Sequence, residues 1–187
     1  MRAASAITPH RFAGGLALAA LGCSPASETR PAKVVDADFV VGEPADQGAL
    51  QLDHTCLGRD RSPRLSWEAA ALPASASHIA VRVRSRDGVV WLAWDAPVTD
   101  NHLPAAILGP TAPPTQGTNH RGRVGWAGPC PPDKARGQML QNSVEVEFFV
   151  TSDRIAAPPT TPAPEVVDRA QPLLVAYGIR RLDLDLR

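Results

Sequence analysis

Three segments have the apolar pattern of β-strands, and they restrict the fold more than any other feature. Residues 78–84 (HIAVRVR) alternate, with apolar side chains on one face and arginines on the other, which is typical of a half-buried strand. Residues 89–94 (VVWLAW) are apolar on both faces, as in a strand central to a sandwich. Residues 143–151 (SVEVEFFVT) alternate again. The short connection Arg86–Gly88 predicts that the first two segments form a hairpin.

The C-terminal part combines a helical pattern with a final strand. After a Pro-rich breaker at residues 156–164, apolar residues recur at helical spacing from Val166 to Tyr177, and Pro172 should kink or split that helix. Residues 182–186 (LDLDL) alternate and predict a closing strand. The chain has 19 prolines in 187 residues, twice the usual share of ~5 %. We predict a mainly β fold, an antiparallel β-sandwich with a C-terminal helix, a closing strand and long Pro/Gly-rich loops.

The N-terminal segment has the order of a secretory signal, residues 1–22. Two arginines precede a short apolar run at residues 13–22, which is too short to span a bilayer. Cys23 follows directly, so that Ala-Leu-Gly-Cys resembles a bacterial lipoprotein box. We expect an exported protein, either periplasmic or anchored to the membrane by a lipid on Cys23; ordinary cleavage without an anchor is the alternative. Residues 23–45 are expected to form a flexible tether and residues 46–187 the folded domain.

Charge and cysteine content restrict the partners. Lys+Arg and Asp+Glu both number 19, so the chain has no net charge. We therefore expect no nucleic-acid partner, and we expect membrane contact only through the lipid anchor. After export, Cys56 and Cys130 are an even pair in an oxidising compartment. A disulfide between them would contribute ~4 kcal/mol, and two buried free thiols or a metal site are the alternatives. Only a His-x-Cys pair, His54 with Cys56, approaches a chelating spacing, so we expect no metal.

Residues 125–132 (GWAGPCPP) specify one backbone path. Three prolines fix φ and two glycines free it, which is more than a plain surface turn requires. Because the prolines have no N–H donors, the segment leaves carbonyls facing outward. Such a segment suits the rigid wall of a pocket, and it equally suits a tight structural crossover.

Three further segments are informative together: residues 54–67 (HTCLGRDRSPRLSW), 94–97 (WDAP) with 103–104 (LP), and 117–119 (GTN) with 125–132. They are similar to the motifs Thr-Cys-x-Gly-x-x-x-Ser-Pro-x-Leu-x-Trp, Trp-Asn-Ile-Pro…Leu-Pro and Gly-x-Asn…Gly-Tyr-x-Gly-Pro-Cys-Pro-Pro. In this the chain resembles the phosphatidylethanolamine-binding protein family, specifically its bacterial Raf-kinase-inhibitor-like branch. The resemblance runs from about residue 48 to the C-terminus, and it implies the same sandwich fold.

In that family the Pro-rich segment lines a small anion pocket, with further walls from an Asp-Pro-Asp-Ala-Pro turn, a His-Trp pair and a His-Arg-Tyr strand start. The resemblance implies that the ligand-binding residues here are Asp87, Trp91, Cys130, Pro131, Pro132 and Asn142. The pocket is degenerate, because Val90 replaces the histidine of the His-Trp pair and residues 142–144 lack the second histidine and the tyrosine. An anionic ligand needs a positively charged or protonatable group nearby, and the one cation predicted at this pocket is Arg86. Arg86 lies on the predicted turn, where it could point into the pocket or stay solvated.

Two classes of function follow. The first is a non-enzymatic binding protein for a small anionic ligand or a phosphorylated lipid head group. The alternative is a protein-interaction module, kinase- or protease-inhibitor-like, with a vestigial pocket and a protein target. A hydrolase would need a nucleophile, a base and an orienting group, and the chain has no Gly-x-Ser-x-Gly motif. We therefore expect neither enzymatic activity nor a cofactor.

Overall fold

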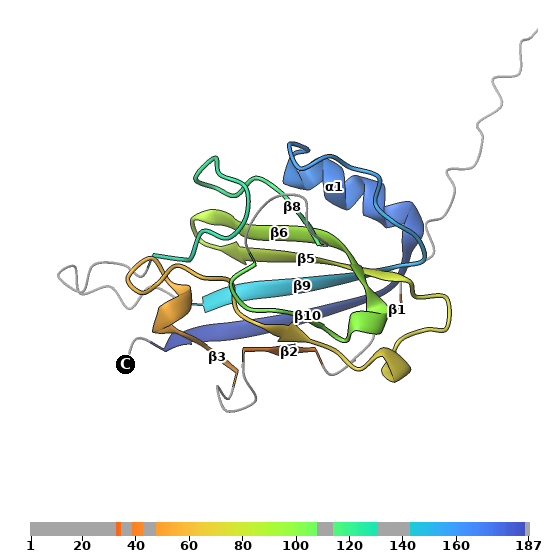
Figure 1. The fold of residues 1–187 in the computed structure, drawn as a ribbon, viewed down its shortest axis with the longest axis horizontal. Coiled ribbons are helices and arrows are strands. Elements are labelled where there is room, and N and C mark those ends of the chain that lie inside the picture. Colours follow the sequence, from red (N-terminus) through yellow and green to blue (C-terminus); the bar gives the residue numbers. More distant parts are fainter. Residues whose placement is uncertain (1–32, 35–38, 43–47, 108–113, 131–142, 186–187) are drawn as a thin grey trace, which may run out of the picture. The chain divides into compact units, whose positions relative to one another are not determined.

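The computed structural model describes residues 33–34, 39–42, 48–107, 114–130 and 143–185 (Figure 1). The chain divides into two units, Met1–Arg30 and Pro31–Arg187, and every described residue belongs to the second. The predicted signal segment and Cys23 lie outside the described residues. In the part of the chain that is described, no helix is long and apolar enough to cross a bilayer.

A seven-stranded sheet forms the larger layer, in the order β1-β10-β9-β5-β6-β8, with β3 also paired to β10. Its strands are β1 Lys33–Val34, β3 Ala49–Gln51, β5 His78–Ser85, β6 Gly88–Pro97, β8 Thr115–Gln116, β9 Ser143–Thr151 and β10 Leu174–Asp185. Strands β5, β6 and β9 confirm the three strands predicted from the sequence. The long strands are antiparallel to one another, whereas the short β1 and β3 lie parallel to β10.

A second, three-stranded sheet packs on one face of the first and completes the predicted sandwich. It contains β2 Val40–Val41, β4 Leu65–Ser66 and β7 His102–Leu103. Because side chains alternate along a strand, Val81 and Val83 of β5 both enter the core between the sheets. The ring of Phe39 stacks on that of Phe148 at 4.1 Å. Phe39 and Val41 fall in the range predicted as tether, so the packed core extends N-terminal to residue 46.

The opposite face of the large sheet is covered in part by α1 (Ala163–Ala170), drawn in blue in Figure 1. Val166 of this helix packs in a second apolar cluster with Ala80, near the start of β5, and Phe149, near the end of β9. Short 3-10 helices complete the described structure, at Leu52–His54, Ala69–Ala71, Val98–Asp100 and Gln171–Leu173.

The predicted C-terminal helix is correct only in its first half. The α-helix ends at Ala170, a 3-10 turn containing Pro172 follows, and β10 begins at Leu174. Pro172 has no N–H to continue the helical hydrogen-bond ladder, and the chain beyond it pairs with β9 instead. The helical prediction to Tyr177 is therefore wrong, and the predicted closing strand is the end of one long strand.

Candidate functional site

An open hollow of about 410 Å³ lies where the β5–β6 hairpin turns, and we call it the hairpin hollow. The α1 cluster involves the other end of β5 and β9, so the helix leaves this end of the sheet face accessible. The hairpin, the start of β9 and the second half of β10 supply the lining residues: Arg84, Ser85, Gly88, Val89, Ser143, Glu145 and Arg181.

A cross-strand row of three charges dominates this lining. Glu145 on β9 is the register partner of Arg84 on β5 and of Arg181 on β10. The Arg84 guanidinium donates to one carboxylate oxygen of Glu145, and Arg181 Nη2 lies 3.3 Å from the other. The side chains of Arg84 and Arg181 are 47 % and 74 % exposed. Two arginines face one glutamate, so the row carries one excess positive charge toward solvent.

The adjacent row of the sheet is partly buried, and its polar side chains bond to one another. Arg82 donates to both carboxylate oxygens of Glu147, at 2.6 and 2.8 Å, and the Tyr177 hydroxyl donates to the same carboxylate at 2.9 Å. Burial opposes ionisation of Glu147, but the hydrogen bonds from Arg82 and Tyr177 outweigh it and hold its pKa below the ordinary value. Burial, reinforced by the bond to Glu147, raises the pKa of Tyr177 to about 12. This row lies beside the charged row on the same face of the sheet, and Arg84 Nε connects the two at 3.1 Å from Glu147.

Asp87 and Arg86 lie on the hairpin turn beside the hollow rather than among its lining residues. Arg86 Nε is 3.5 Å from Asp87 Oδ1, and the two side chains are 43 % and 33 % exposed. The Asp87 N–H donates to Ser85 Oγ at 3.1 Å, which shapes the turn. Arg86 thus pairs on the surface, and the cations of the hollow are arginines that the sequence analysis did not select.

Trp91 is fully buried and packs beneath the Gly-Trp-Ala-Gly-Pro-Cys segment. Its exposure is 0 %, its indole N–H donates to Gln116 Oε1 at 2.7 Å, and its ring meets that of Trp126 edge-on at 5.9 Å. A side chain without exposed surface has no contact area to offer a ligand. Trp91 therefore supports the segment that contains Trp126. The prediction that Trp91 itself contacts a ligand does not fit its burial.

The segment that contains Gly-Trp-Ala-Gly-Pro-Cys runs beside the first half of β6. The backbone N–H groups of His120 and Ala127 donate to the carbonyls of Val89 and Val90, at 2.8 and 3.0 Å. Since Val89 lines the hairpin hollow, this loop is attached directly to the hollow's edge. Pro131, Pro132 and Asn142 lie outside the described residues, although Asn142 directly precedes the lining residue Ser143.

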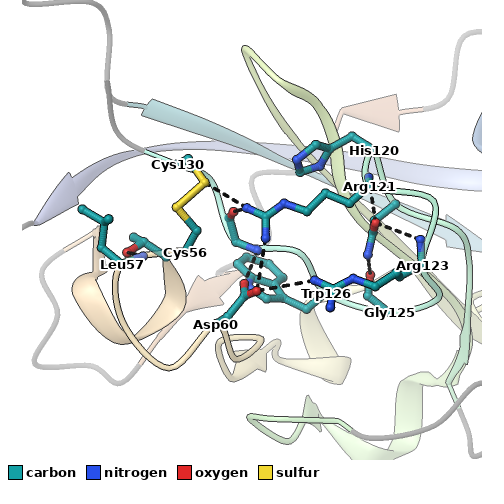
Figure 2. A network of polar contacts seen from close by, with 12 residues as sticks. Cys56, Leu57, Asp60, His120, Arg121, Arg123, Gly125, Trp126 and Cys130 are labelled. Atoms are coloured by element: carbon teal, nitrogen blue, oxygen red, sulfur yellow. Dashed lines mark hydrogen bonds and ion pairs between the residues drawn. A yellow bond between two sulfur atoms is a disulfide. The ribbon is translucent and has the colours of Figure 1, made fainter. Parts of the chain in front are cut away.

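A disulfide joins Cys56 to Cys130, 74 residues apart in the chain, and a polar network surrounds it (Figure 2). Arg121 Nη2 donates to the Gly128 carbonyl and to Cys130 Sγ, both at 2.9 Å. The Asp60 carboxylate accepts the Gly128 N–H at 2.5 Å and lies 3.3 Å from Arg121 Nη1. These contacts fix the 117–130 segment onto the loop that follows β3.

Among the described residues, neither a metal site nor a paired nucleophile and base faces the hollow. Among the residues that the structure describes, no group of three His, Cys, Asp or Glu side chains could hold a metal ion. Ser77 Oγ and His78 Nδ1 lie 2.8 Å apart, but they are at the start of β5, and the hydroxyl also bonds to the Thr151 carbonyl. The hollow is at the other end of that strand, so this pair does not face it.

Comparison with known proteins identifies the family. Residues 42–138, more than half of the chain, match the family model described as phosphatidylethanolamine-binding protein. The chain belongs to the phosphatidylethanolamine-binding protein family. The match includes the β5–β6 hairpin and the 117–130 segment, and therefore includes the hairpin side of the hollow.

Two curated relatives are both called UPF0098 protein. The one from Methanothermobacter thermautotrophicus is 32 % identical over 96 residues, which cover 46 % of this chain and 62 % of the relative. The one from Aquifex aeolicus is 29 % identical over 115 residues, covering 57 % of this chain and 63 % of the relative. The chain thus matches somewhat less than two thirds of the length of these relatives.

Two solved structures share the fold. A Chlamydia trachomatis protein described as a homolog of phosphatidylethanolamine-binding protein has a TM-score of 0.61 and 15 % identity, over 80 % of this chain and 98 % of that one. Escherichia coli YbcL, described as a new member of the mammalian family, has a TM-score of 0.62 and 19 % identity, over 82 % and 98 %. At these identities the likeness shows the fold alone, and it agrees with the predicted mainly β architecture.

Proposed function

We propose that this protein is a non-enzymatic binding protein whose hairpin hollow takes a small phosphorylated ligand of the lipid head-group class. The observation that carries this proposal is the row Arg84, Glu145 and Arg181, with its excess positive charge at the rim of a 410 Å³ hollow. The family to which the chain belongs is described by phosphatidylethanolamine binding, and this supports the choice of ligand class.

The charge pattern of the row suits a zwitterionic head group. Arginine binds phosphate oxygens through paired N–H donors, and Arg181 is exposed enough to turn toward a ligand without leaving a buried charge behind. Glu145 lies between the two arginines and would face a neighbouring ammonium group. A phosphoethanolamine group carries both charges, so it complements the row better than phosphate alone. In this proposal the arginines replace the histidines whose absence made the pocket look degenerate.

We also propose that the protein acts outside the cytoplasm. The signal-like segment at residues 1–22 and Cys23 support export and, through Cys23, a lipid anchor. The Cys56–Cys130 disulfide supports an oxidising compartment, where such bonds persist. Acid-stable incorporation of labelled fatty acid into the expressed protein, lost in Cys23→Ala, tests the anchor.

The test of the binding site is a thermal-shift titration of the purified protein with phosphoethanolamine, inorganic phosphate and ethanolamine. A ligand at 100 times its dissociation constant adds ~2.7 kcal/mol, which raises Tm by several degrees in a domain of this size. We expect the largest shift with phosphoethanolamine and its loss in Arg181→Glu. Arg169→Glu, a reversal at an arginine on α1 outside the hollow, should leave ligand shifts unchanged. No shift with any of the three compounds would contradict the proposal and favour the protein-interaction alternative.

A further inference from the structure

A second cavity, of about 450 Å³, lies between three loops and shares no lining residue with the hairpin hollow. We call it the Trp126 pocket. Its lining includes Arg61, Ser62, Ile107, Gln116, Val124 and Trp126. The volume falls within the range of roughly 300–1,000 Å³ of small-molecule sites. The family resemblance assigned no residue of this pocket to a ligand.

Part of the lining is apolar, and the Trp126 ring in it is held by two contacts. The Trp126 indole N–H donates to the His54 carbonyl at 3.1 Å, and the ring packs edge-on against buried Trp91. The polar atom of Trp126 is thus already used, so the ring offers the cavity only apolar surface. Ile107 is partly buried beside it, and Val124 is 42 % exposed. An apolar, planar body fits these walls.

The lining also includes an exposed cation, Arg61, that has no ion-pair partner among the described residues. Arg121 and Arg123, in contrast, pair with the Asp60 carboxylate (Figure 2), at 3.3 and 3.8 Å. Asp60 also accepts the Gly128 N–H. The negative charge of Asp60 is therefore balanced by Arg121 and Arg123, and Arg61 is available to pair with a ligand.

The backbone is left-handed at two positions that line the pocket. Asp60 and Ala106 have φ values of +52° and +57°. Aspartate adopts this region readily, whereas for alanine it is unfavourable and needs support from the surrounding structure. The Ala106 N–H donates to the Ser62 carbonyl at 3.0 Å and the Ile107 N–H to Ser62 Oγ at 3.1 Å. Ser62 Oγ therefore accepts one bond and keeps its own hydrogen to donate.

We propose that the Trp126 pocket is a second binding site, specific for small organic carboxylates with an aromatic body. The ring lies against Trp126, Ile107 and Val124, and the carboxylate forms a two-point ion pair with Arg61. This site recognises an apolar body together with its charge, whereas the hairpin hollow recognises charge alone. It does not depend on phosphate binding at the hollow.

The experiment is calorimetric titration of the whole purified protein with 2-naphthoate and, separately, with the neutral 2-naphthamide. We expect 2-naphthoate to bind at least tenfold more tightly, because a hydrogen bond to a charged group contributes about 1.5–3 kcal/mol and 1.4 kcal/mol is tenfold. Arg61→Ala should weaken 2-naphthoate at least tenfold and leave 2-naphthamide unchanged. Arg64→Ala is the matched control, since Arg64 is an exposed arginine of the same segment outside the lining.

A second variant tests the apolar side without removing a core residue. Val124→Asp places a negative charge at an exposed lining position and should weaken 2-naphthoate at least tenfold, whereas the near-isosteric Val124→Thr should not. Inorganic phosphate should not displace 2-naphthoate, because it has no apolar body. Equal affinity for the acid and the amide, full affinity in both Arg61→Ala and Val124→Asp, or no heat with either compound at millimolar concentration would overturn the proposal.

Discussion

Breaking the Cys56–Cys130 disulfide should cost this protein a large part of its stability, chiefly through the unfolded chain. The bond closes a loop with a sequence separation of 74. The loop-closure relation gives a lost entropy of about 15 cal/mol/K for a loop of this length, or ~4.4 kcal/mol at 25 °C. A domain is stable by only ~5–15 kcal/mol in total, so the double variant Cys56→Ser/Cys130→Ser should be marginally stable.

The folded state should change little in that variant, because the two segments are also held together without the bond. The Cys56 N–H donates to the Pro129 carbonyl at 3.2 Å, and Gly128 is bonded to both Asp60 and Arg121. These contacts do not involve the sulfur atoms. The loss therefore belongs to the greater freedom of the unfolded chain rather than to a damaged native structure.

The assay is guanidinium unfolding followed by the fluorescence of the four tryptophans, for the oxidised protein, the reduced protein and the double variant. We expect the reduced protein and the variant to agree and to lie about 4 kcal/mol below the oxidised protein, with a larger m-value because a chain without the cross-link exposes more surface. A loss under about 1 kcal/mol would refute the loop-closure reasoning, as would a variant much less stable than the reduced protein.

Three further results are expected. Glu147→Gln should lower the free energy of unfolding by about 2 kcal/mol, because the partly buried guanidinium of Arg82 would lose its counter-charge. An unchanged urea midpoint would contradict this. Tyr177 is the single tyrosine, and its folded pKa of about 12 lies above the unfolded value of ~10. Its contribution is complete below pH 10 and is lost as pH rises toward 12, so phenolate absorbance should titrate late in the folded protein, and Tyr177→Phe should flatten the alkaline loss of stability. Gly128→Ala should cost about 3 kcal/mol, because a Cβ there would lie 2.3 Å from a backbone carbonyl oxygen, whereas Gly122→Ala meets open space at positive φ and should cost only about 1 kcal/mol; equal thermal midpoints for the two variants would be inconsistent with the close approach.

The helix at the C-terminus shows how far a local pattern can be trusted. Val166 to Tyr177 fits helical spacing, yet the chain changes to β10 after Pro172. A spacing of apolar residues records which side chains are buried, but both a helix and a strand can bury them. What decided between the two was an available edge of β9, which lies far away in the sequence.

The amino-acid sequence is sufficient to predict the strands β5, β6 and β9, the mainly β class and, through three motifs, the family. These are local properties, since alternation along a strand and turn chemistry need no knowledge of the partner. The two candidate sites, in contrast, depend on how distant segments pack together. Arg84 and Arg181 meet at Glu145 because three strands share a register, and Arg61 and Trp126 line one pocket because separate loops converge. A site made of cross-strand and loop-to-loop neighbours has no fixed spacing in the chain, and therefore no motif that reveals it.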